Sequence, residues 1–218
     1  RESYINAVFL PAYKGNDYFI ITQTPLENTK VDFWRMVYQF DVRSIVMMNT
    51  LSQMKDEERY WPEDEEELEI PPFRITLESK STDDINTKYI LSLRYDEHLC
   101  KVQLSRATYW TDDEPVPKSP SAMLMQIDLI KNWQQETGNK PVIVHCMNGA
   151  DRSGLFCVVS ALIERTITEQ DVAIEQTIKQ MRSRRPQVIP NVDQFKFCYD
   201  VTKTYLEQYD SYSNFTRP

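Results

Sequence analysis

The stretch at residues 142–154, VIVHCMNGADRSG, joins a buried strand to a helix through a short loop. Its opening residues are β-branched and apolar, which is typical of a strand buried on both faces. Its last residues lead into an apolar run at 155–165, which predicts a buried helix. Cys146 and Arg152 stand six positions apart between these two elements. The stretch therefore predicts a strand, a tight loop and a helix N-terminus, with a cysteine and an arginine at the two ends of the loop.

A cysteine placed between a strand and a helix N-terminus lies in a nest of backbone N–H groups that point at one place. Such a nest binds an anion and favours the nucleophilic thiolate form of Cys146. The planar guanidinium of Arg152 can bind two oxygens of a tetrahedral oxyanion, and Ser153 can donate a hydrogen bond to the sulfur. We expect these residues to form a cysteinyl-phosphate intermediate. A buried, unreactive cysteine is the alternative for a lone cysteine–arginine pair at this spacing.

Five residues between Cys146 and Arg152 would form the wall of the phosphate cradle. They are Met147, Asn148, Gly149, Ala150 and Asp151.

Length and composition favour one α/β domain with a substantial core, because the chain has 218 residues of which 41% are hydrophobic. The net charge of −8 makes the protein a poor partner for nucleic acid or an anionic membrane. Any phosphate site must therefore be positive locally, against the overall charge. The first residue is Arg1 and no signal peptide follows, so we interpret the sequence as a fragment of a longer chain.

The cysteines and histidines argue against a metal site. Four cysteines without a CxxC pair and two histidines do not provide a zinc-binding pattern. The same cysteine usage suggests no disulfide framework and fits a reducing compartment. No run of 18 apolar residues occurs, so nothing in the sequence predicts a membrane span.

The remaining chain contains signals for alternating strands and helices without repeats or linkers. Buried or alternating apolar patterns predict strands at 18–23, 44–48, 73–78, 89–95 and 99–107, with a hairpin turn at 96–97. Helical spacing predicts helices at 31–40, from a cap at Ser119 or Ser121 to about 136, from a cap at Thr168, and at 192–209. The acidic run at 64–69 is expected to be a solvated loop.

The signature HC-x5-R-[ST] at 145–153 resembles that of the cysteine-dependent protein tyrosine phosphatases. Further motifs follow the order of that family: YINA at 4–7, TQTPL at 22–26, DFWRM at 32–36, IVM at 45–47 and YWP at 60–62. The resemblance covers nearly the whole chain. It implies one phosphatase domain over 1–218, built on a twisted mixed β-sheet flanked by helices. It also implies His145 as a supporting residue, a phosphotyrosyl protein or peptide as partner, and no cofactor or metal.

The general acid of this family is an aspartate on a mobile WPD loop, which protonates the leaving tyrosyl oxygen. The corresponding stretch is YWTDDEPVP at 109–117. Counting forward from Trp110 places the acid at Asp112, whereas counting back from 116–117 places it at Asp113. Both aspartates remain candidates, and an acidic surface turn is the alternative for the stretch.

Several positions depart from the family pattern. Pro190 stands where the family has its first water-orienting glutamine, while the second is kept as Gln194. Asn148 and Asp151 stand where small residues are usual. We expect the Asp151 carboxylate to compete with phosphate for Arg152 and to repel a phosphate dianion, or to have little effect if it points outward. We also expect a strained backbone at this position, because glycine is usual there and can adopt positive φ.

This set of departures resembles the second, membrane-distal phosphatase domain of a receptor-type tyrosine phosphatase, as do the stretch at 113–135 and the tail at 205–215. The resemblance implies weak or absent activity with a regulatory or interaction role, and a competent phosphatase is the alternative. It also implies a position on the cytoplasmic side of the plasma membrane, an anchor outside this fragment and a preceding phosphatase domain as a possible partner. A peroxide-sensitive redox sensor and a phosphotyrosine-binding module that never turns over are two further hypotheses.

Overall fold

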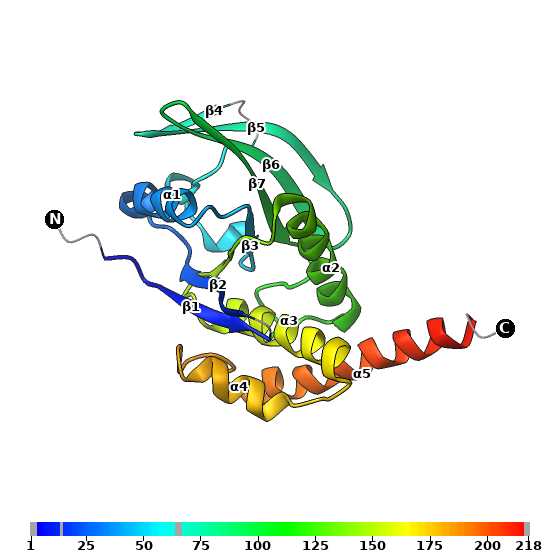
Figure 1. Ribbon diagram of the computed structural model, residues 1–218. Helices are drawn as coiled ribbons and strands as arrows, with labels where there is room; N and C mark the ends of the chain where they lie inside the picture. Colours follow the sequence, from blue (N-terminus) through cyan, green and yellow to red (C-terminus); the bar gives the residue numbers. More distant parts are fainter. Residues whose placement is uncertain (1–3, 14, 64–66, 216–218) are drawn as a thin grey trace.

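The computed structural model describes residues 4–13, 15–63 and 67–215, with no description of the side chains at 15–17 and 209–215. One eight-stranded sheet runs through the molecule in the order β1-β2-β8-β3-β7-β6-β5-β4 (Figure 1). The strands are β1 (Ala7–Ala12), β2 (Gly15–Gln23), β3 (Ser44–Met47), β4 (Glu67–Ile70), β5 (Phe73–Thr82), β6 (Asn86–Tyr95), β7 (His98–Ala107) and β8 (Val142–Cys146).

The sheet is parallel at its centre and antiparallel towards both edges. Strand β8 pairs in parallel with β2 on one side and β3 on the other, and β3 pairs in parallel with β7. The outer pairs are antiparallel. Since parallel strands end at the same edge of a sheet, the loops that follow β2, β3, β7 and β8 meet at one edge.

The two faces of the sheet carry separate hydrophobic clusters because successive side chains of a strand point to opposite faces. In β8, Val142, Val144 and Cys146 belong to one cluster, whereas Ile143 belongs to the other. The first cluster is covered by α2 (Pro120–Thr137), α3 (Asp151–Glu169), α4 (Ile174–Arg182) and α5 (Val192–Phe215). The second lies under α1 (Lys30–Gln39) and the antiparallel strands β4–β7 (Figure 1).

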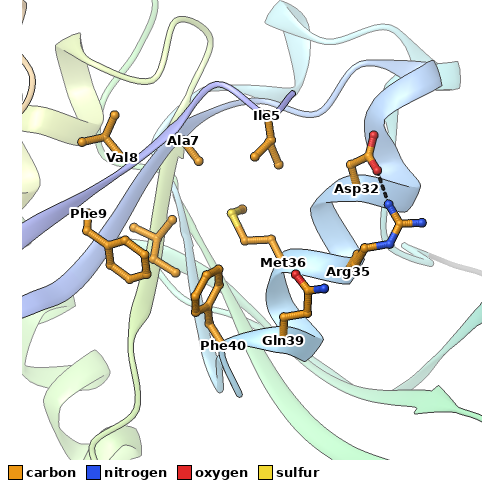
Figure 2. Close-up of a pocket in the computed structure, with 10 residues that line it drawn as sticks. Ile5, Ala7, Val8, Phe9, Asp32, Arg35, Met36, Gln39 and Phe40 are labelled. Atoms are coloured by element: carbon orange, nitrogen blue, oxygen red, sulfur yellow. Dashed lines mark hydrogen bonds and ion pairs between the residues drawn. The ribbon is translucent and has the colours of Figure 1, made fainter. Parts of the chain in front are cut away.

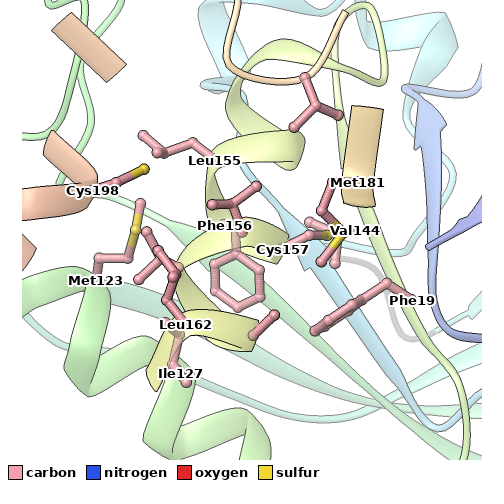
Figure 3. Packing of buried hydrophobic residues seen from close by; sticks show 14 of the residues in the cluster. Phe19, Met123, Ile127, Val144, Leu155, Phe156, Cys157, Leu162, Met181 and Cys198 are labelled. Carbon is pink, nitrogen blue, oxygen red and sulfur yellow. The ribbon is translucent and has the colours of Figure 1, made fainter. Parts of the chain in front are cut away.

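Helix α3 is the central helix of the first cluster. Its residues 152–163 are all buried, and α4 and α5 lie on its side away from the sheet (Figure 1). Figure 3 shows Phe156 and Leu162 of this helix packed with Met123 and Ile127 of α2. The loop that precedes α3 is therefore fixed at one end by β8 and at the other by the buried part of α3.

Most of the expected elements are confirmed, and the twisted mixed sheet flanked by helices is confirmed with them. The hairpin turn falls at 96–97, where Asp96 has φ 54° and Tyr95 pairs with His98. Ser119, not Ser121, caps α2: its Oγ accepts a hydrogen bond from the backbone N of Ala122 at 3.2 Å. The described ranges also contain short 3₁₀ helices at Glu27–Thr29, Leu51–Gln53 and Asp56–Glu58.

Two expectations were wrong. Thr168 caps no helix, because it lies inside α3, which extends to Glu169, and Ala173 occupies the N-cap position of α4. The acidic run at 64–69 is not all loop: residues 67–69 form part of β4, whose pairing with β5 overrides their low strand propensity, and residues 64–66 lie outside the described ranges.

No helix of the described ranges is long and apolar enough to cross a membrane.

Candidate active site

Strand β8 ends at Cys146, four residues form a loop, and α3 begins at Asp151. The loop passes so close to β2 that only glycine fits at its centre. A Cβ atom on Gly149 would lie 2.4 Å from the backbone N of Gln23, and Gly149 has φ +65°, a conformation that favours glycine. The loop therefore lies against β2 and leads into the N-terminus of a buried helix, an arrangement that can bind an anion.

The sulfur of Cys146 lies at the bottom of this nest and is nearly inaccessible to solvent, since the residue is 2% exposed. Ser153 is fully buried, and its hydroxyl oxygen lies 3.2 Å from the sulfur, as expected for a donor to the leaving thiolate. The thiol also donates a hydrogen bond to the carboxamide oxygen of Asn148 at 3.3 Å. The structure thus brings the expected nucleophile and its expected hydroxyl partner together.

The side chain of Asn148 turns back over the loop. Its Oδ1 accepts hydrogen bonds from the backbone N–H of Ala150 at 3.0 Å and of Asp151 at 3.1 Å. The backbone oxygen of Asn148 accepts from Arg185 at 3.2 Å, which ties the loop to the segment after α4. Met147, the other exposed residue of the loop, has 42% of its surface exposed.

The guanidinium of Arg152 is held by backbone carbonyl groups from two neighbouring loops. Its Nη1 donates to the oxygens of Met48 at 3.3 Å and Trp110 at 3.2 Å, and its Nη2 donates to the oxygen of Thr111 at 2.8 Å. The guanidinium carbon also lies 4.7 Å from the ring centre of Trp110. Arg152 is 9% exposed, so these contacts replace water for most of its donors.

The structure separates the two candidate acids. Asp112 lies beside Arg152, with its Oδ1 3.7 Å from Nη2. Its carboxylate accepts hydrogen bonds from the hydroxyls of Thr50, at 2.8 and 2.7 Å, and of Ser52, at 2.7 Å. Asp113 is exposed, and a hydrogen bond with the Thr111 side chain holds the pKa of its carboxyl below the ordinary value.

Both expectations about Asp151 were wrong. Its carboxylate accepts a hydrogen bond from the Nε2 of Gln194 rather than pairing with Arg152. It occupies the first turn of α3, where a negative charge is favourable, and it is not among the residues with positive φ. Gln194 is buried and lies at the loop, whereas Pro190 is exposed and provides no amide group.

His145 supports the loop from the opposite face of β8. Burial lowers the pKa of this imidazole to about 3, so it is neutral. Thr24 donates its hydroxyl proton to Oδ1 of Asn49 at 3.0 Å, and therefore accepts from Nδ1 of His145 at 3.2 Å. The Nε2 atom then accepts from the hydroxyl of Tyr60 at 2.6 Å, because burial raises the pKa of Tyr60 and keeps it protonated. This chain of neutral hydrogen bonds joins β8 to the loops after β2 and β3.

Sequence reasoning did not identify Thr50, Ser52 or Arg185 as part of the site. The first two follow β3, which is parallel to β8, so their position after a strand that ends at the same edge is the signal that could have found them. Arg185 follows α4 and carries no comparable local signal. Within the described ranges, no cluster of three or more His, Cys, Asp or Glu side chains could hold a metal ion.

A separate hollow lies between β1 and α1 and is lined mainly by apolar side chains, among them Phe9, Met36 and Phe40 (Figure 2). Its charged lining is the ion pair of Asp32 with Arg35. None of its lining residues belongs to the loop at 147–150, so this hollow is separate from the candidate site at Cys146.

Comparison with known proteins identifies the family and the fold. Residues 1–204 match the family described as protein-tyrosine phosphatase. The receptor-type tyrosine-protein phosphatase epsilon of Mus musculus is 32% identical over 97% of this chain and 31% of its own length. The receptor-type tyrosine-protein phosphatase alpha of Homo sapiens is 31% identical over 99% of this chain and 27% of its own length. The chain thus spans about a third or less of these relatives.

Solved structures agree. The catalytic domain of human protein tyrosine phosphatase non-receptor type 18 superposes with a TM-score of 0.84 at 29% identity, over 92% of this chain and 74% of that one. A structure of PTPN18 in complex with HER2-pY1196 phosphopeptides gives a TM-score of 0.84 at 28% identity, over 94% and 72% of the two chains.

Proposed function

Because the chain belongs to the protein-tyrosine phosphatase family, we propose that it is a receptor-type phosphatase domain with weak or no turnover and a regulatory or interaction role. We place it second, distal to the membrane, on the cytoplasmic side of an anchored receptor. The similarity to receptor-type phosphatases epsilon and alpha supports the receptor type. The expected partners are a phosphotyrosyl protein or peptide and a preceding phosphatase domain.

One observation carries the proposal of weak turnover: the arginine and the aspartate that catalysis needs are engaged with the protein itself. Arg152 donates to three backbone carbonyls, and Asp112 accepts from two hydroxyls. To clamp a phosphate, the guanidinium would have to give up its hydrogen bonds to these carbonyl groups. Little water is available to replace those bonds, so the change costs free energy. To protonate a leaving group, Asp112 would have to release the hydroxyls of Thr50 and Ser52.

The alternative is a competent phosphatase that works through a cysteinyl-phosphate intermediate. The observation in its favour is the distance of 3.2 Å between the Cys146 sulfur and the Ser153 hydroxyl, on a loop built as an anion nest. In that case Cys146 is the nucleophile, Arg152 the phosphate clamp, Asp112 the acid and Gln194 an aid to the attacking water.

Initial rates of phosphate release from a phosphotyrosyl peptide separate the two functions, with Cys146→Ser as the control. We expect the wild-type rate to be close to that of Cys146→Ser. A fast rate that disappears in Cys146→Ser would overturn the proposal and establish the alternative. Asp112→Asn compared with Asp113→Asn would then identify the acid, because removal of the proton donor lowers the rate and removal of the other carboxylate does not.

A further inference from the structure

The carboxamide of Asn148 lies where an oxygen of a bound phosphate would lie. A phosphoryl group held over the sulfur of Cys146 must place its oxygens against the loop N–H groups, and Oδ1 of Asn148 already accepts from two of them at 3.0 and 3.1 Å. The same oxygen is 3.3 Å from the sulfur itself. Backbone N–H groups only donate, so the carboxamide must present its oxygen to them. Asn148 therefore stands in for one oxyanion oxygen.

We propose that Asn148 is a built-in occupant of the phosphate cradle and regulates oxyanion binding by competing for the loop N–H groups. The inference deepens the proposed function and rests on it only in taking the nest at Cys146 as the phosphate site. An incoming oxyanion must displace the carboxamide oxygen before it can accept the same hydrogen bonds.

The position of Asn148 makes the competition reversible. The residue is exposed, although its Oδ1 reaches the buried sulfur, so its side chain can rotate into solvent while the loop stays in place. Two contacts that do not involve that side chain also hold the loop backbone: the close packing of Gly149 on β2 and the hydrogen bond of Arg185 to the Asn148 carbonyl. Opening the cradle thus requires a rotamer change and no refolding.

Occupancy by Asn148 and repulsion by Asp151 make different predictions. The Asp151 carboxylate is turned towards Gln194, and its backbone N–H, rather than its side chain, faces the carboxamide. Removing the carboxylate of Asp151 therefore leaves the cradle occupied. Removing the carboxamide of Asn148 empties it without changing the net charge.

Isothermal titration calorimetry with tungstate, a tetrahedral oxyanion, tests the proposal without any turnover. We expect Asn148→Ala to bind tungstate about tenfold more tightly than wild type, since two competing hydrogen bonds of ordinary net strength are lost. Asn148→Asp, which keeps the shape and adds a negative charge, should bind more weakly than wild type. Asn132→Ala, an exposed asparagine of α2, is the matched control and should leave the affinity unchanged.

Equal or weaker tungstate binding by a folded Asn148→Ala protein would overturn the proposal. So would tighter binding in Asp151→Gly that Asn148→Ala does not share, because repulsion and not occupancy would then limit the site. Asn148→Ser provides a second small side chain if the alanine variant does not fold. Fast peptide hydrolysis by the wild type refutes the proposed function, whereas unchanged tungstate affinity refutes this inference, so the two failures are distinguishable.

Discussion

Acidification should destabilise the domain through His145 before its carboxylates are affected. The ordinary pKa of this imidazole is 6.5, and burial lowers it to about 3 in the folded protein. The unfolded chain therefore binds one more proton than the folded one between these pH values. The contribution of neutral His145 to the free energy of unfolding is fully present above pH 6.5 and decreases as the pH falls below it. The hydroxyl of Tyr60 donates to Nε2 of His145, which leaves that nitrogen no room for a proton of its own.

The magnitude follows from the shift. Each pH unit between about 6 and 4 should lower the free energy of unfolding by about 1.4 kcal/mol, and the step from pH 7 to pH 5 by about 2 kcal/mol in total. Carboxyls with lowered pKa values, such as Asp41 and Glu78, lose their contribution at lower pH, because their ordinary values are 3.8 and 4.5. The interval from pH 7 to pH 5 thus isolates the histidine.

Urea unfolding followed by tryptophan fluorescence at pH 7 and pH 5 measures this difference. The chain contains two histidines, and exposed His98 offers a matched control. His98→Gln should keep the loss of about 2 kcal/mol, whereas His145→Gln should remove most of it, because an amide does not titrate. A loss of the same size in His145→Gln, or no loss in the wild type, would refute a neutral buried imidazole.

Two further substitutions test the packing around the site and a helix cap. Gly149→Ala should lower the free energy of unfolding by about 2 kcal/mol or more, because the new Cβ would meet the backbone N of Gln23 at 2.4 Å in a left-handed conformation; an unchanged urea midpoint would contradict the close approach. Ser119→Ala should cost about 1 kcal/mol through loss of the α2 cap, whereas Ser121→Ala should have little effect; equal losses in thermal unfolding would argue against the assigned cap.

Local patterns were sufficient for the elements that contact their sequence neighbours. The apolar residues of β8 form a strand through their own burial, and the turn at 96–97 forms through its local backbone conformation. Strand β4 was missed because its acidic residues have low strand propensity, and pairing with β5 decides its conformation.

The site shows the same division. Spacing alone placed Cys146, Ser153 and the glycine of the loop, because these residues lie within one strand–loop–helix unit. Spacing did not predict the direction of the Asp151 side chain. It was expected to face Arg152, and it faces Gln194, which comes 43 positions later. Spacing also left Asp112 and Asp113 equivalent.

The sequence by itself determined the fold class, the strand–loop–helix unit that carries Cys146 and Arg152, and the resemblance to the phosphatase family, because these depend on residue order within short segments. Only the tertiary structure decided what each polar group contacts. Asp112 meets the hydroxyl of Thr50 across 62 positions, and Arg152 meets the carbonyl of Met48 across 104, because parallel strands bring their following loops to one edge of the sheet. Hydrogen-bond partners are chosen by distance in space, and residue spacing does not record that distance when the partners come from separate loops.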